Sequence, residues 1–144
     1  MAVTEEEFLM LCERFLEESE YDLEFCKDHA LLTYYAYKGA DDAGFIAIRD
    51  KVGVLQGAAL VVADYFAHAR PFGYVVKFYV LPEYRGGMVA AKLIKGCNKW
   101  FDERGTIADF ATPLAKIGDN NKALGLLRRL GYSNEAVHLY REKA

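Results

Sequence analysis

The stretch from residue 72 to residue 104 constrains the fold more than any other part of the chain. β-Branched and aromatic residues run from Phe72 to Leu81 and stop at Pro82, which has no amide proton to continue a strand ladder. A short turn with two glycines follows. Apolar side chains then return at helical spacing, at Val89, Leu93, Cys97, Trp100 and Phe101. The stretch predicts a strand, a glycine-containing turn and a helix buried on one face.

This strand-to-helix junction predicts an anion site. It directs several unpaired backbone amides and the positive end of a helix dipole at one spot. The turn is not a P-loop, because no Gly-Lys-Ser/Thr closes it, and the Gly-x-Gly-x-x-Gly spacing of dinucleotide sites is absent. A connection that binds nothing remains the alternative.

The composition predicts one globular domain over residues 1–144. Of these residues, 53% are hydrophobic, yet no apolar run reaches the roughly 18 residues that cross a bilayer. Three glutamates follow Thr4, unlike the basic start of a signal peptide. Cys12, Cys26 and Cys97 lack CxxC or ligand spacing, which favours reduced thiols and no metal site. We therefore expect a cytoplasmic protein with no membrane partner.

Charge is unevenly spread along the chain. Residues 1–30 hold ten acids and two bases, whereas the remainder holds sixteen bases and eleven acids. An acidic start beside a mildly basic remainder disfavours nucleic acid as the main partner. It suits a cationic substrate on one side and an anionic cofactor on the other. Ordinary solvated helix faces are the alternative explanation.

Two helices are predicted before any strand. Thr4 and Glu7 have the spacing of a capping box, which predicts a helix from about Glu5 to Glu18. Residues 19–22 repeat a capping pattern, so a second helix is expected to start there and to end near Gly39.

Strands and helices alternate in the rest of the chain. Residues 45–49 and 54–63 are predicted to pair as antiparallel strands, with Gly57 marking a bulge or close packing. A helix then separates the central strand from the next, so that next strand should run parallel to it. The remaining predicted elements are a strand over 106–112, a helix over 120–130 and a last strand over 136–141.

Two segments resemble signatures of the GNAT N-acetyltransferase superfamily. The first is Tyr79-Val80-Leu81-Pro82-Glu83-Tyr84-Arg85-Gly86, which leads into a turn similar to the family's Arg/Gln-x-x-Gly-x-Gly/Ala. Met88 stands where the family usually has the first of those glycines. The second segment resembles Asn-x-x-Ala-x-x-Leu-Tyr-x-x-Leu-Gly-Phe/Tyr and contains Asn120, Ala123, Leu126, Leu130, Gly131 and Tyr132.

The resemblance implies a fold class. It is an α/β (α+β) GNAT-like acyl-CoA N-acyltransferase fold, with a central mixed, mostly antiparallel sheet flanked by helices. The element order α-α-β-β-β-α-β-α-β follows the family from the first helix onward, although the family's opening strand is missing or reduced to Ala2-Val3.

The resemblance also implies two binding regions and no metal. Acetyl-CoA would lie at the carboxyl end of the central strand, with its pantetheine against the backbone of Phe78, Tyr79 and Val80. Its diphosphate would rest on the backbone amides of Arg85, Gly86, Gly87, Met88, Val89, Ala90 and Ala91, and Asn120 would face the pantetheine or phosphate. The connection between the first two helices would overlie the acceptor, with a rim of Glu18, Glu20, Tyr21 and Asp22.

The catalytic residues are less defined. Lys77 occupies a position where some family members place a carboxylate, and a protonated lysine cannot accept a proton. Leu127 occupies the position where many members carry a tyrosine that protonates the leaving thiolate. Tyr79, Tyr132 and Tyr140 are possible replacements, so no catalytic residue is assigned.

Two functions remain open. The resemblance favours transfer of an acetyl group from acetyl-CoA to a primary amine of a small molecule or protein, by a monomer or homodimer. The alternative is a catalytically impaired relative that serves as an acyl-CoA-binding or protein-interaction module.

Overall fold

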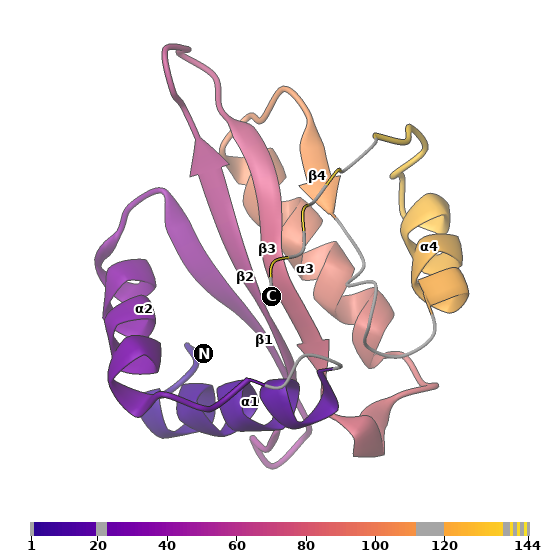
Figure 1. Ribbon diagram of the computed structural model, residues 1–144. Coiled ribbons are helices and arrows are strands. Elements are labelled where there is room, and N and C mark those ends of the chain that lie inside the picture. The colour runs from indigo at the N-terminus through magenta and orange to yellow at the C-terminus, as the bar shows by residue number, and fades with distance from the viewer. Residues whose placement is uncertain are drawn as a thin grey trace.

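The computed structural model describes residues 2–19, 23–111 and 120–136, together with Leu139, Arg141 and Lys143. In chain order its elements are α1 (Glu5–Glu18), α2 (Lys27–Gly39), β1 (Ala43–Arg49), β2 (Leu55–Asp64), β3 (Phe72–Val80), the 3-10 turn η1 (Pro82–Tyr84), α3 (Val89–Glu103), β4 (Asp109–Ala111) and α4 (Asn120–Arg129) (Figure 1).

Helix α1 has the predicted bounds and cap. The Glu7 amide donates to Thr4 Oγ1 at 3.1 Å, and the Thr4 amide donates to Glu7 Oε1 at 2.9 Å. This reciprocal pair satisfies two of the donors that a helix start leaves free.

The predicted start of the second helix is wrong. Helix α2 begins at Lys27, and the described residues 23–26 before it are not helical. The physical reason lies at Cys26, whose extended backbone (φ −117°, ψ 105°) cannot continue a helix. The end of α2 at Gly39 is as predicted.

The described strands form one sheet in the order β1-β2-β3-β4. Strands β1 and β2 pair antiparallel, as do β2 and β3, whereas β4 runs parallel to β3 as predicted. Within the described residues, strand β4 pairs with residues 73–75 of β3. The β2–β3 register shifts between Leu60 and Val61, which leaves a bulge at Val76 in the carboxyl half of β3.

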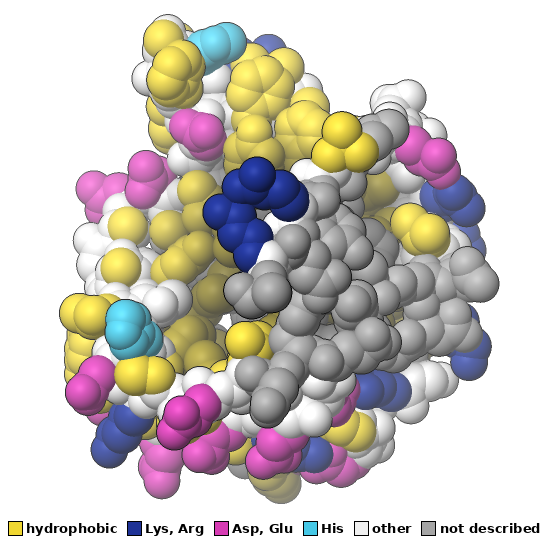
Figure 2. Space-filling model, in the orientation of Figure 1, with side chains coloured by type: hydrophobic (Ala, Val, Ile, Leu, Met, Phe, Trp, Pro, Cys, Tyr) yellow, Lys and Arg dark blue, Asp and Glu magenta, His cyan; other side chains and the backbone are white. Residues whose placement is uncertain are grey.

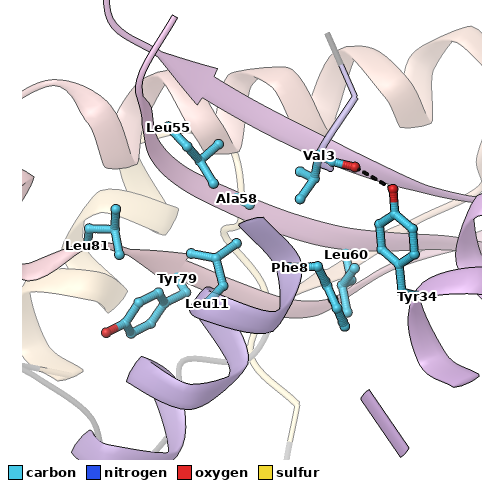
Figure 3. Close-up of a cluster of buried hydrophobic side chains, with 9 residues drawn as sticks. All are labelled: Val3, Phe8, Leu11, Tyr34, Leu55, Ala58, Leu60, Tyr79 and Leu81. Carbon is cyan, nitrogen blue, oxygen red and sulfur yellow. Dashed lines mark hydrogen bonds between the residues drawn. The ribbon is translucent and has the colours of Figure 1, made fainter. Parts of the chain in front are cut away.

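Helices cover both faces of the sheet. On the α1 and α2 face lies a buried cluster made of Val3, Phe8, Leu11, Tyr34, Leu55, Ala58, Leu60, Tyr79 and Leu81 (Figure 3). The Tyr34 hydroxyl donates to the Val3 carbonyl at 2.8 Å within it. The opposite face packs on α3 through Ala59, Val61, Val80, Val89, Leu93, Cys97 and Phe101. The alternation of β2 side chains between faces supplies both cores.

Gly57 allows α3 to start close against the sheet. A Cβ atom at this glycine would lie 3.1 Å from the Tyr79 carbonyl oxygen and 3.3 Å from Val89 Cγ1. The β1–β2 register also shifts beside it, between Ile48 and Arg49, which confirms the expected irregularity. The first residue of α3 is thereby held beside the carboxyl end of β3.

The carboxyl-terminal part of the chain is described only in part. Gly131 (φ +104°) follows the end of α4, as predicted for a glycine stop. The predicted last strand over 136–141 falls largely outside the described residues. Its described members Ala136, Leu139 and Arg141 are not in a strand. Within the described part of the chain, no helix combines the length and apolar character that a membrane span needs.

Candidate active site

The turn between η1 and α3 presents a row of free backbone amides. The Arg85 amide donates to the Pro82 carbonyl at 3.3 Å, and the Lys92 amide donates to the Met88 carbonyl at 3.0 Å. The amides between them, from Gly86 to Ala91, make no hydrogen bond within the described residues. They lie at the amino terminus of α3, where the helix dipole is positive. This arrangement can bind an anion.

The space in front of the turn is open. A Cβ atom at Gly86 or Gly87 would meet no atom within 4 Å. The Met88 side chain, which replaces the family's usual glycine, is 62% exposed and belongs to the wall of the space. The Val89 side chain is only 8% exposed and packs into the α3 core, so this residue can offer an anion only its amide. Gly86 also has φ +87°, a conformation that favours glycine.

A cavity of about 970 Å³ extends from this turn along β3 to Ala111 at the end of β4 and to α4. We call it the turn cavity. Its lining includes most of the residues predicted to bind the coenzyme, namely Phe78, Tyr79, Val80, Arg85, Gly86, Gly87, Met88, Ala90 and Ala91. Leu127 on α4 also lines it. The side chain of Asn120, the remaining predicted contact, is outside the description.

Among the described residues that line the turn cavity, every charged side chain is basic. They are Arg85, Lys95, Lys122 and Arg129. Lys92 and Lys99, on the same helix as Lys95, are exposed and do not line it. The cavity therefore favours a ligand with several negative charges.

A second cavity, of about 450 Å³, lies between the first two helices and the sheet. We call it the helix cavity. Most of its wall is apolar and includes Val3, Phe8, Leu11, Cys12, Phe15, Leu16, Leu23, Phe25, Ala30, Phe45, Ala58, Ala59, Leu60 and Phe78. Figure 2 shows hydrophobic side chains gathered in a hollow between α2 and the sheet, with Lys and Arg side chains beside it.

The two cavities share part of their walls. Phe15, Phe78 and Tyr79 line both of them. Two ligands, one in each cavity, would therefore approach each other across these three residues on α1 and β3.

A network of hydrogen bonds joins this shared wall to the turn. The Tyr79 hydroxyl donates to Glu18 Oε1 at 2.7 Å, and Arg85 Nη2 lies 2.8 Å from Glu18 Oε2. Arg85 Nε also donates to the Val80 carbonyl at 2.9 Å. Burial, reinforced by the bond to Glu18, raises the pKa of Tyr79 to about 12. In the predicted acceptor rim, the charge of Glu18 is paired with Arg85. The other predicted rim residues, Glu20, Tyr21 and Asp22, lie outside the described residues.

The tyrosines considered as proton donors to the leaving thiolate are hydrogen-bonded elsewhere or lie outside the described residues. The Tyr79 proton is held by Glu18, as described above. The Tyr132 hydroxyl donates to Asn98 Oδ1 at 2.6 Å, burial raises its pKa, and it lines neither cavity. Tyr140 lies outside the described residues. Leu127 offers no proton. Of the three tyrosines considered from the sequence, neither described one is therefore free to protonate a leaving group in the turn cavity.

Sequence reasoning missed two titratable residues of the helix cavity. Glu24 and His29 line it and are exposed. Nothing in the local sequence distinguishes them from surface residues near a helix start. Lys77 lines the same cavity, with its Nζ 5.3 Å from the centroid of the Phe15 ring. Cys12 lines it too, but burial raises the pKa of this thiol to about 11, so it stays protonated at neutral pH.

Comparison with protein families assigns the fold. The model of the acetyltransferase (GNAT) family matches residues 6–132. The chain belongs to the GNAT acetyltransferase family. In this GNAT protein the two cavities meet at β3, close to the turn with free amides. A search of curated proteins found no match.

Solved structures share this GNAT fold at low sequence identity. AAC(6')-Iy, in complex with the bisubstrate analogue CoA-S-monomethyl-acetylneamine, has a TM-score of 0.71 and 22% identity over 97% of this chain and 92% of its own. A putative acetyltransferase from Agrobacterium tumefaciens has a TM-score of 0.77 and 12% identity over 99% and 98%. The apo aminoglycoside 6'-N-acetyltransferase AAC(6')-IG from Acinetobacter haemolyticus has a TM-score of 0.70 and 16% identity over 96% and 91%.

Proposed function

We propose that this GNAT protein transfers an acetyl group from acetyl-CoA to a primary amine. The turn cavity receives the coenzyme and the helix cavity receives the acceptor. The proposal depends on the row of free amides from Gly86 to Ala91. These amides border a cavity whose charged lining residues, among those described, are all Lys or Arg. The GNAT relative AAC(6')-Iy, bound to a CoA-containing analogue, supports it.

The turn cavity fits the parts of the coenzyme. The amides of residues 86–91 suit a diphosphate, because each can donate a hydrogen bond to an anionic oxygen. Lys95 and Arg129 add positive charge on the α3 and α4 sides. No described residue of β4 pairs with residues 76–80 of β3, so under this proposal their backbone pairs with the amides of a pantetheine chain.

The reaction joins the acceptor nitrogen to the thioester carbonyl carbon and breaks the carbon–sulfur bond. The nitrogen loses a proton and the departing CoA thiolate gains one. The groups of the helix cavity able to accept a proton, among the described residues, are Glu24 and His29. Water protonates the thiolate, since Leu127 cannot. Burial raises the pKa of Cys12, which disfavours an acyl intermediate on that thiol, so the proposed transfer is direct.

Alignment of the two reactants supplies most of the rate. Holding them together is worth about 7–11 kcal/mol, whereas a general acid or base contributes about 10²–10⁴-fold. The lack of a tyrosine at Leu127 therefore slows the reaction without preventing it.

Calorimetric titration with acetyl-CoA, followed by a thiol-release assay over a panel of amines, tests the proposal. We expect Gly87→Asp to weaken acetyl-CoA binding at least about 10-fold, because it places a carboxylate beside the diphosphate site. Gly87→Ala is the matched control, since the space around Gly87 is open. Equal affinity of the Asp and Ala variants, with unchanged unfolding midpoints, would contradict the assigned role of the turn.

One observation favours a second function. Lys77 and Leu127 stand where GNAT enzymes often carry a base and an acid, so a module that binds acyl-CoA without turnover is the competing proposal. Tight acetyl-CoA binding with no thiol release on any amine would support that module and reject the enzyme.

A further inference from the structure

The helix cavity is built for an apolar ligand. Its wall carries five phenylalanines, at positions 8, 15, 25, 45 and 78, together with leucine and alanine side chains from α1 and the sheet. A cavity of about 450 Å³ is within the size range of small-molecule sites. A ligand covered with ammonium and hydroxyl groups would lose its hydration here without replacement hydrogen bonds.

A lysine of the helix cavity lies beside the wall that both cavities share. Lys77 Nζ sits 5.3 Å from the centroid of the Phe15 ring, and Phe15 lines both cavities. Lys77 makes no ion pair within the described residues. Its positive charge is therefore available to a ligand in the helix cavity, beside the shared wall.

Among the described residues, no carboxylate forms an ion pair with Lys77. Glu18, at the end of α1, is already paired with Arg85 and accepts a hydrogen bond from the Tyr79 hydroxyl. Glu24, the one described carboxylate that lines the helix cavity, lies in the exposed segment before α2. An ammonium ion near Lys77 would be repelled, whereas a carboxylate would be attracted.

We propose that the acceptor is an α-amino acid with a large apolar side chain, bound through its carboxylate to Lys77. The side chain fills the helix cavity among the phenylalanines. Because the amine and the carboxylate share one carbon, a carboxylate at Lys77 leaves the amine beside Phe15 and Phe78, at the wall shared with the turn cavity. This inference rests on the proposed acetyl transfer and names its acceptor.

The transfer is balanced for such an acceptor. The neutral α-amine attacks the thioester carbon, a carbon–nitrogen bond forms and the carbon–sulfur bond breaks. The products are an N-acetyl amino acid and CoA, and the proton lost by nitrogen matches the one gained by the thiolate. Lys77 is a positioning group for the carboxylate and takes no part in the bond changes.

Steady-state kinetics with three acceptors test the proposal. These are L-phenylalanine, phenethylamine, which lacks the carboxylate, and neamine, which carries several ammonium groups. We expect the order of kcat/KM to be phenylalanine, then phenethylamine, then neamine. Removing one charged partner of a hydrogen-bonded pair gives a loss of about 10- to 100-fold, and we expect that loss between the first two.

Charge substitutions at Lys77 give a result that a purely structural role would not. Lys77→Met should raise the KM for phenylalanine by about 10-fold or more and lower the KM for phenethylamine, because attraction and repulsion disappear together. Lys77→Glu should reverse the preference and favour both cationic amines. Lys51→Met, an exposed lysine in the turn between β1 and β2, should change neither value.

The outcomes distinguish failure of the amino-acid acceptor from failure of the proposed acetyl transfer. Turnover in which neamine is preferred, or an equal effect of Lys77→Met on phenylalanine and phenethylamine, overturns the acceptor assignment and leaves acetyl transfer standing. Acetyl-CoA binding without turnover on any of the three overturns both. The opposite KM changes for phenylalanine and phenethylamine establish the carboxylate contact.

Discussion

Arg49 joins three separated parts of the chain through one side chain. Its guanidinium donates to both carboxylate oxygens of Glu7, at 2.6 and 2.8 Å, and to the carbonyls of Gly53 and Ala2 at 3.0 and 2.8 Å. Its Nε is buried and has no partner in the described structure. The pair with Glu7 therefore supports the α1 start, the β1 end and the residues before α1 at once.

The hydrogen bonds from Arg49 lower the pKa of Glu7 from 4.5 to about 2. Because the folded pKa lies below the unfolded one, the stabilisation is complete above pH 4.5 and is lost as the pH falls towards 2. We expect Glu7→Gln to lower the free energy of unfolding by about 1–3 kcal/mol at pH 7, and the gap to close over that window.

Urea unfolding at several pH values measures this difference. Glu6→Gln is the control, because it removes the same charge from the same helix turn at an exposed position. A Glu7→Gln deficit that stays constant down to pH 3 would mean that the carboxylate charge is not its source.

Leu127 is the residue whose replacement reports most directly on the chemistry. It lies on α4, is 8% exposed and lines the turn cavity. We expect Leu127→Tyr to raise kcat by about 10-fold or more, because a hydroxyl in this wall can protonate the departing thiolate. Leu127→Phe, which adds the ring without the hydroxyl, should not raise it. Equal kcat values for the two variants would place the thiolate elsewhere.

At the scale of elements, α3, β3 and β4 meet at Gly73. A Cβ atom there would lie 2.5 Å from Asp109 Oδ1 and 2.6 Å from Phe101 Cδ1, closer than real contacts allow. Phe101 is fully buried and Asp109 accepts a hydrogen bond from Thr106, so neither moves freely. The glycine lets β4 pair with residues 73–75 of β3 while Phe101 of α3 packs against the same point.

We expect Gly73→Ala to lower the free energy of unfolding by about 1–3 kcal/mol through this overpacking. Gly125→Ala, in the interior of α4 with nothing within 4 Å, should instead raise it by about 0.5–1 kcal/mol, because alanine is the better helix former. Thermal unfolding compares the two variants. An unchanged free energy of unfolding for Gly73→Ala would show that the surrounding side chains can move to accept the methyl group.

Local sequence patterns predicted a helix start well where a capping box is formed by nearby residues. The Thr4 and Glu7 pair fixed the start of α1 because both halves of the box depend on residues within one turn. The second capping pattern, at residues 19–22, was misleading because the backbone is extended at Cys26, and residues 23–26 line the helix cavity instead of forming a helix. That is a tertiary requirement, and no propensity contains it.

Across the whole molecule, charge separates the two cavities. The turn cavity has four basic side chains among its described lining residues, and the helix cavity is mostly apolar. We expect the dissociation constant of acetyl-CoA to rise several-fold between about 0.05 M and about 0.5 M salt, because screening weakens attraction to the phosphates. Acceptor KM values should change less. A coenzyme affinity independent of salt, measured by calorimetry, would argue that shape alone determines binding.

The turn cavity, which we propose for the coenzyme, could be anticipated from sequence because much of its wall is continuous in the chain. Phe78 to Val80 and Arg85 to Ala91 are close in the chain, so one motif indicates the strand, the turn and the helix start together. The helix cavity, which we propose for the acceptor, is assembled from α1, α2, β1, β2 and β3. The pairing of Glu18 with Arg85, and the place of His29, depend on contacts across many residues, which a single sequence does not record.

The common wall formed by Phe15, Phe78 and Tyr79 has a consequence for altering this protein. A change at any of the three alters the walls of both cavities. Leu23, Phe25 and His29 border the helix cavity and not the turn cavity, so under the proposed function they can be exchanged while the coenzyme keeps its contacts. Redesign for new amines should therefore begin at the segment before α2 and at the first turn of that helix, and leave β3 intact.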